Sequence, residues 1–136
     1  MKFDFEKLDV WQIAFDLSEK VYSLTKAFPA SEIYGITNQL RRASLSISLN
    51  IAEGKGRYST KEFKQFLFVA RGSLYETVTL LRMCLRLRYI TEAQYDIVIK
   101  MCETIQSKLS GLSNYLRGKN DVGAGCSKPR TLQPTA

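Results

Sequence analysis

The sequence predicts an all-α fold, an up-down-up-down antiparallel four-helix bundle followed by a disordered C-terminal tail. Apolar residues recur at three- and four-residue spacing through four segments, which is the period of an amphipathic helix. Short polar connections separate these segments, so consecutive helices are expected to pack antiparallel. The 136 residues include only three prolines, and few segments alternate as strands do. We expect one domain over residues 1–118 and a disordered tail over residues 119–136, which are rich in glycine, proline and polar residues.

A proline separates the first two helices. The first helix is expected over about residues 6–27, and Pro29 ends it because the residue before a proline is pushed out of the helical conformation. Ser31 and Glu32 supply capping groups for a second helix, whose pattern begins near Gly35.

A short turn joins the second helix to the third. Gly54 and Gly56 suit a C-terminal cap of the second helix. Ser59 and Glu62 have the spacing of a capping box, in which each residue binds the backbone of the other at a helix start. The second and third helices should therefore form an antiparallel hairpin.

The third helix is expected over about residues 60–88. Thr91 and Gln94 repeat the capping pattern and begin a fourth helix that ends near Arg117. Gly72 lies inside the third helix without the strand-to-helix context of a phosphate-binding loop. We expect a neighbouring helix to approach closely at this glycine.

The stretch from Gln39 to Arg57 is predicted to be central, because a helix there is apolar on two opposite sides. One side faces the core through Ile36, Leu40, Ala43, Ile47 and Ile51. The other side has a counterpart on the third helix, and together they form an outer apolar face of Leu45, Leu49, Ala52, Val69, Leu80, Met83 and Leu87. A single bundle buries one wide face per helix, so this outer apolar face predicts a homo-oligomer. Closer crossing of the helices, burying part of each second face, is the alternative.

A polar line runs between the two apolar sides of the second helix and continues on the third. It consists of Arg42, Ser46, Asn50, Glu53, Ser73 and Glu76. In an antiparallel hairpin Arg42 comes level with Glu76, so an ion pair within a satisfied polar network is expected. The alternative interpretation is a ligand-binding or catalytic pocket with Glu53 as general base.

The formal net charge of +7 is concentrated in the middle of the chain. Residues 33–90 hold ten basic and three acidic side chains, whereas residues 1–32 hold four basic and six acidic ones. Such a local excess favours an anionic partner.

Cations alternate with aromatic rings along one side of the third helix. We call Lys64, Phe68, Arg71, Tyr75, Arg82 and Arg86 the basic stripe, and the preceding Lys55, Arg57, Tyr58 and Lys61 the hairpin tip. Cations neutralise phosphates and rings stack on unpaired bases, so both segments are predicted to bind nucleic acid, RNA or DNA. Packing of the rings against a neighbouring subunit is the alternative.

The remaining composition argues against several kinds of site. Cys84, Cys102 and Cys126 are widely spaced and the chain has no histidine, which argues against a disulfide framework, a zinc site or a histidine base. Cys84 and Cys102 lie on or beside apolar helical faces and are expected in the core, and Cys126 is expected as a free thiol in the tail. No metal and no cofactor is expected.

The sequence predicts a cytoplasmic protein with no membrane partner. No apolar run approaches the ~20 residues that span a bilayer. The N-terminal residues are charged and form no apolar signal segment.

A series of motifs between Phe5 and Arg117 carries a family resemblance. They are Leu8-Asp-Val-Trp11, Tyr22, Phe28-Pro29, Gln39-Leu-Arg-Arg-Ala43, Ser46-Ile47, Asn50-Ile-Ala-Glu-Gly54, Phe63, Phe66-Leu67, Ala70-Arg-Gly-Ser73 and Glu76. On these residues the chain resembles the bacterial four-helix-bundle proteins encoded in intervening sequences of large-subunit ribosomal RNA genes, some of them labelled ribosomal proteins. It is distantly similar to the accessory variability protein of diversity-generating retroelements. Ser48 stands where the family pattern often has proline, so a milder kink is expected there.

This resemblance implies a compact cytosolic bundle that assembles into rings, pentamers in some members. The distant retroelement relative is also a pentamer and binds nucleic acid and its reverse transcriptase through basic surface. The family supplies no established catalytic residue, so none is transferred to this chain.

The residues and the resemblance together favour a non-enzymatic, homo-oligomeric bundle that binds nucleic acid, with structured RNA as first choice. The alternative is an oligomeric scaffold that docks an acidic partner protein. A third hypothesis is an enzyme that uses Glu53 or Glu76.

Overall fold

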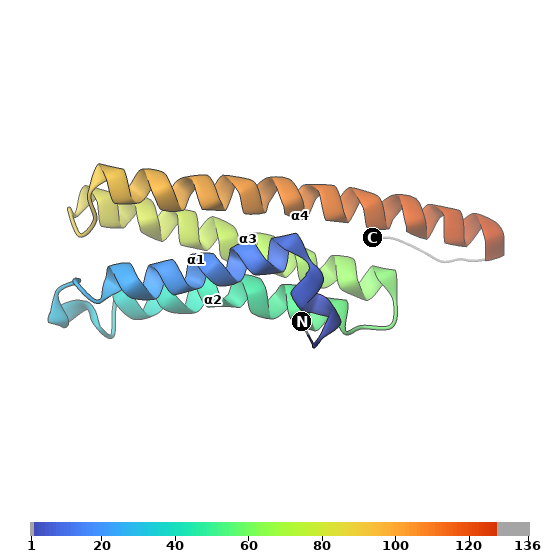
Figure 1. Cartoon of the computed structure of the whole chain (residues 1–136), viewed down its shortest axis with the longest axis horizontal. Coiled ribbons are helices and arrows are strands. Elements are labelled where there is room, and N and C mark those ends of the chain that lie inside the picture. The colour runs from blue at the N-terminus through green and yellow to red at the C-terminus, as the bar shows by residue number, and fades with distance from the viewer. Residues whose placement is uncertain (1, 128–136) are drawn as a thin grey trace.

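The computed structural model describes the backbone of residues 2–127 and the side chains of residues 2–119. This part of the chain contains four α-helices, two 3₁₀ helices and no strand. They are η1 (Asp4–Lys7), α1 (Asp9–Thr25), η2 (Ala30–Glu32), α2 (Ile36–Lys55), α3 (Thr60–Arg86) and α4 (Glu92–Ser127). Figure 1 shows the four α-helices aligned along one axis, with connections at alternating ends. α1 packs on α2 and α4, and α3 packs on the same two helices, which confirms the predicted antiparallel bundle.

The first predicted helix is divided into η1 and α1. Leu8 is extended, with ψ 122°, so the continuous helix begins at Asp9. The Glu6 carboxylate accepts hydrogen bonds from the backbone N–H groups of Lys2 and Phe3, at 2.9 and 2.8 Å. These bonds hold the 3₁₀ turn closed, and the Phe5 ring packs edge-on against Trp11 with 5.1 Å between the ring centroids.

The side-chain caps predicted at Glu32, Ser59 and Thr91 are confirmed. Among the described residues, however, Ser31 makes no capping bond, and Glu62 accepts from the Ser59 hydroxyl instead of its backbone N–H. The Glu32 carboxylate accepts from the N–H of Ile36, at 3.3 Å, where α2 begins. The Ser59 hydroxyl accepts from the N–H of Glu62, at 3.1 Å, at the start of α3. Thr91 and Gln94 bind each other's backbone N–H reciprocally where α4 begins.

The third helix ends slightly earlier than predicted. Arg88 adopts a left-handed backbone conformation, with φ 62°, which stops the helix after Arg86. The following N–H of Tyr89 donates to the carbonyl of Cys84, at 2.9 Å. This bond satisfies a carbonyl that the end of the helix would otherwise leave free.

α4 continues ten residues beyond the end predicted at Arg117, to Ser127. Extending an existing helix avoids the cost of nucleating a new one, so a segment of low helix propensity can be added to its end. Figure 1 shows α4 projecting past the other three helices. The remainder of the predicted tail, residues 128–136, lies outside the described residues.

The core runs the length of the bundle and takes side chains from every α-helix. Leu17, Ile47, Leu74 and Ile105 are each fully buried, one from each of α1 to α4. The predicted core side of α2 is confirmed, and α2 passes through Ser48 without interruption.

The structure corrects the sequence predictions for two glycines, Gly54 and Gly72. One of them allows the close approach of α2 and α3. Gly54 lies inside α2 and is buried, while Gly56 is the C-terminal cap. A Cβ atom on Gly54 would lie 2.7 Å from the Cβ of Phe66 and 2.9 Å from the Cδ1 of Phe63. A Cβ atom on Gly72 would meet nothing within 4 Å. The close helix contact is therefore at Gly54, not at Gly72.

Candidate nucleic-acid interface

The basic stripe lies on the surface of α3. Its members recur at helical spacing, and Phe68, Arg71, Tyr75, Arg82 and Arg86 are exposed while Lys64 is half-buried. The stripe faces the α4 side of the helix, because its residues share two surface depressions with α4 residues. The stripe contains no acidic residue.

Tyr75 is held in place at the middle of the stripe. Its hydroxyl accepts hydrogen bonds from Arg71 Nε, at 3.1 Å, and from Gln106 Nε2 on α4, at 3.2 Å. The donated bond from Arg71, with that from Gln106, lowers the pKa of Tyr75 below its usual value. The Arg71 guanidinium also lies 5.2 Å from the centroid of the Tyr75 ring. The Tyr75 ring is therefore held in one orientation, and the residue is 47% exposed.

The hairpin tip combines one anchored cation with exposed groups. Arg57 Nη2 donates to Glu53 Oε1 at 3.4 Å, and its guanidinium lies 4.7 Å from the centroid of the Phe66 ring. Tyr58 has a fully exposed ring, and Lys61 is exposed at the first turn of α3, while Lys55 is half-buried. The tip thus extends the basic stripe around the start of α3.

A small basic pocket lies between the first turns of α3 and the far part of α4. Its volume is about 120 Å³, and it is lined by Lys61, Lys64, Gln65, Phe68, Ser113 and Arg117. Three cations border one aromatic ring here, and none of the lining residues is acidic. This combination suits a phosphate with an adjoining ring.

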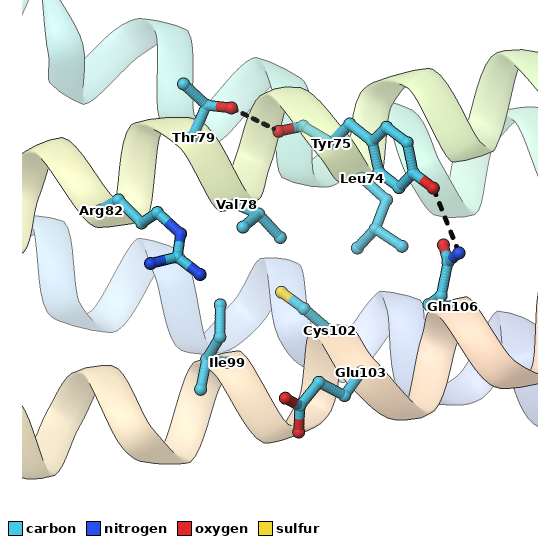
Figure 2. A pocket seen from close by; sticks show the side chains of 9 residues that line it. All are labelled: Leu74, Tyr75, Val78, Thr79, Arg82, Ile99, Cys102, Glu103 and Gln106. Carbon is cyan, nitrogen blue, oxygen red and sulfur yellow. Dashed lines mark hydrogen bonds between the residues drawn. The ribbon is translucent and has the colours of Figure 1, made fainter.

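A larger depression, which we call the α3–α4 groove, lies further along the same two helices (Figure 2). Its volume is about 460 Å³. It is lined by Leu74, Tyr75, Val78, Thr79, Arg82, Ile99, Cys102, Glu103 and Gln106. Tyr75 and Arg82 belong to both the groove and the basic stripe, so the two features are continuous.

The polar line is only partly assembled in the single chain. Ser73 Oγ donates to Ser46 Oγ at 2.9 Å, and Asn50 Nδ2 donates to the same hydroxyl at 3.0 Å. The Ser73–Ser46 bond ties α3 to α2 in the partly buried space between them, whereas the Asn50–Ser46 bond lies within α2. The predicted Arg42–Glu76 ion pair is not formed among the described residues, where both side chains are exposed. Water competes effectively for such exposed charges, which makes an isolated surface pair weak.

Glu53 lies at an exposed position rather than in a pocket. Its carboxylate is bound to Arg57 as described above, and none of the four cavities described on the chain includes it. Nothing in this arrangement positions a second titrating group beside it for acid–base chemistry.

The outer apolar face remains uncovered in the single chain. Leu49, Val69, Met83 and Leu87 are 56%, 53%, 50% and 45% exposed, and Leu45, Ala52 and Leu80 are half-buried. The helices of one chain therefore do not cross closely enough to bury this face. It lies on α2 and α3, away from the α4 side that the basic stripe occupies.

The described thiols are poor nucleophiles. Cys84 and Cys102 are buried and free, which confirms their predicted core positions. Burial raises the pKa of Cys84 to about 11 and that of Cys102 to about 12, so both are neutral thiols near pH 7. The side chain of Cys126 lies outside the described side chains.

The part of the chain that the structure describes contains neither a cluster of metal-ligating side chains nor a helix suited to span a membrane. Among the described side chains of residues 2–119, no group of three or more histidine, cysteine or acidic residues is placed to hold a metal ion. No helix within the described residues has the length and apolar character needed to cross a membrane.

The sequence prediction missed every α4 contribution to this surface. Ile99, Cys102, Glu103 and Gln106 complete the groove, and Arg117 completes the basic pocket. Of these α4 residues, only Gln106 could have been suspected from the sequence, because it is a polar residue next to Ile105 on the core side of a helix. Which α4 residues lie beside the stripe depends on the rotation and register of α4 against α3, and the pattern of either helix alone does not determine these.

Comparison with known proteins agrees with the fold. A crystal structure of a protein of unknown function from the S23 ribosomal protein family of Bacteroides thetaiotaomicron superimposes with a TM-score of 0.70 and 24% identity. The match covers 76% of this chain and 97% of that protein. Comparison with curated protein sequences finds no significant match. The 23S rRNA-intervening sequence protein family matches residues 6–111, which is most of the bundle, and the chain therefore belongs to that family.

Proposed function

We propose that this protein is a non-enzymatic, homo-oligomeric bundle that binds nucleic acid, with structured RNA as its ligand, through the basic stripe and the hairpin tip. The observation that supports this most directly is the composition of the basic stripe on α3, where cations and rings share one side of the helix and none of the six residues is acidic. The basic pocket adds Arg117 of α4 to the same surface.

The cations of this surface are available to a ligand. Lys61, Arg82 and Arg86 form no hydrogen bond or ion pair with any described residue. Contacts to phosphates would release counterions and dominate the affinity, whereas contacts to the rings would add stacking with little dependence on base identity. The expected ligand is therefore recognised by charge and shape more than by sequence.

The salt dependence of binding tests this proposal. Anisotropy of a labelled structured RNA, titrated with the protein, is expected to show an affinity that falls by roughly 50- to 2,000-fold over a fourfold increase in salt, if about four to six phosphates are contacted. A DNA duplex measured in parallel compares the two nucleic acids. An affinity that is absent at low salt, or that does not change with salt, would contradict the proposal.

The outer apolar face supports the oligomeric part of the proposal. Several half-exposed aliphatic side chains on neighbouring helices form a patch that a second copy can bury. The family resemblance implies rings, with five subunits in some members. Because the face lies away from the basic stripe, assembly leaves the stripe accessible.

A charge placed in the outer apolar face is expected to prevent assembly. Met83→Glu should reduce the mass in solution from a multiple of 15.5 kDa to 15.5 kDa, because the interface would bury an unpaired carboxylate. Ile97→Glu on α4 is the matched control, since Ile97 is 52% exposed but lies outside the face. Light scattering gives both masses. A wild-type mass of 15.5 kDa, or equal dissociation by the two variants, would contradict this interface.

The second candidate function is a scaffold that docks an acidic partner protein on the same cations. The α3–α4 groove favours it, because its floor is apolar and would accept a protein side chain. A well-assembled oligomer that binds no RNA at moderate salt would support this function over the first.

A further inference from the structure

The α3–α4 groove has the form of a small binding site. Figure 2 shows Leu74, Val78, Ile99 and Cys102 between a tyrosine at one end and an arginine at the other. The volume of about 460 Å³ falls in the range of roughly 300–1,000 Å³ that is usual for ligand pockets. A flat apolar group fits such a floor, and polar groups around it can bind the edge of that group.

One end of the groove is an aromatic wall that is already fixed. Two hydrogen bonds to the Tyr75 hydroxyl, one from each helix, hold the ring in the orientation that Figure 2 shows. A fixed ring loses little conformational freedom when another ring stacks on it. The groove is thus preorganised to bind an aromatic group in preference to a flexible aliphatic one.

Three residues around the floor, Gln106, Arg82 and Glu103, have polar atoms without a partner among the described residues. Gln106 Oε1 is buried and accepts no hydrogen bond, although Nε2 of the same amide is bound to Tyr75. Exchanging the two amide atoms would leave the nitrogen unpartnered instead. Arg82 and Glu103 at the rim form neither of the ion pairs found among the described residues. Donors and acceptors are therefore both available at the edge of an apolar slot.

We propose that the α3–α4 groove receives an unpaired nucleobase of the RNA, stacked on Tyr75 and hydrogen-bonded at its edge by Gln106 or the rim charges. This inference rests on the proposed function. It is favoured by continuity, because Arg71 and Arg82 bracket the groove on the stripe and can hold the phosphates on either side of a looped-out base. A nucleobase also supplies an N–H group for Gln106 Oε1, the amide atom that has no partner among the described residues.

The proposal predicts that Tyr75→Ala weakens binding of unpaired RNA selectively. Stacking of one base on an aromatic ring is worth about 1–3 kcal/mol, so the affinity for a short single-stranded RNA should fall by about 5- to 150-fold. The same strand annealed to its complement should lose less than about threefold, because its bases are not free to enter the groove. A fluorescent adenine analogue in the single strand should be quenched on binding to the wild type and not to Tyr75→Ala.

Three further variants separate the groove from its surroundings. Tyr75→Phe keeps the ring and should retain single-strand affinity within about threefold of the wild type. Tyr115→Ala removes a ring that is 64% exposed on α4 outside the groove, and should change nothing. Ile99→Trp fills the groove and should lower single-strand affinity without lowering duplex affinity. Circular dichroism and the oligomer mass confirm that each variant is folded and assembled.

The outcomes distinguish this inference from the proposed function. Equal losses for single-stranded and duplex RNA in Tyr75→Ala would overturn the groove proposal, since Tyr75 would then act by orienting Arg71. Unquenched fluorescence on the wild type, or dissociation of the oligomer by Ile99→Trp, would overturn it as well. Failure of the wild type to bind either RNA would instead overturn the proposed function.

Discussion

Reversing three unpartnered cations of the α3 surface is expected to lower RNA affinity by about 100-fold or more at moderate salt. The variant is Lys61→Glu with Arg82→Glu and Arg86→Glu, which removes three phosphate contacts and places three carboxylates against the phosphates. The slope of log affinity against log salt should also decrease by about two to three, since each lost phosphate contact lowers it by roughly 0.7–0.9. None of the three side chains has a partner among the described residues, so thermal stability should change little.

The matched control reverses three cations elsewhere. Lys7, Lys26 and Lys100 are exposed on η1, after α1 and on α4, and their replacement by glutamate lowers the net charge from +7 to +1, as the first variant does. An affinity close to that of the wild type is expected, apart from a modest loss of long-range attraction. Anisotropy titrations of both variants decide the matter. Equal losses would mean that overall charge, rather than the α3 surface, drives binding.

Gly54→Ala is expected to destabilise the bundle by about 1 kcal/mol, although alanine is the better helix former. The helix propensity of alanine favours the variant by about 1 kcal/mol. The new Cβ would lie 2.7 Å from the Cβ of Phe66, next to the α3 backbone, so the two helices must move apart. Such overpacking usually costs about 1–3 kcal/mol, and the separation also loosens the contacts around it. Urea unfolding followed by circular dichroism measures the change.

Gly72→Ala is the control for this prediction, because it makes the same chemical change in α3. A Cβ there meets nothing within 4 Å, so only the helix propensity acts and stability should rise by about 0.5–1 kcal/mol. Opposite signs for the two substitutions are the expected result. A stabilising Gly54→Ala would contradict the close α2–α3 contact.

Features that depend on neighbouring residues were predictable from the sequence. The capping pairs Ser59 with Glu62 and Thr91 with Gln94 mark helix starts that the structure confirms, because a cap is a contact over three residues. Helical periodicity likewise identified the core side of α2 and the exposed basic stripe. The family followed from short motifs between Leu8 and Glu76, and the family match over residues 6–111 confirms it.

Features that depend on how two helices meet required the tertiary structure. Gly54 was predicted as a cap because a glycine near a helix end usually is one, yet its role is to admit the Phe63 and Phe66 side chains of α3. Arg42 was predicted to pair with Glu76 because the two residues come level in an antiparallel hairpin, but both side chains are exposed to solvent.

The α3–α4 groove shows the same division most clearly. The sequence by itself determined four amphipathic helices, their caps and a basic stripe on the third, since all of these follow from contacts within one helix or one turn. Only the tertiary structure decided that Gln106 reaches Tyr75 and that Ile99 and Cys102 lie opposite Val78. The physical reason is that a rotation or a shift of one turn between two packed helices leaves each helix's own pattern unchanged, whereas it replaces every residue that faces across the contact.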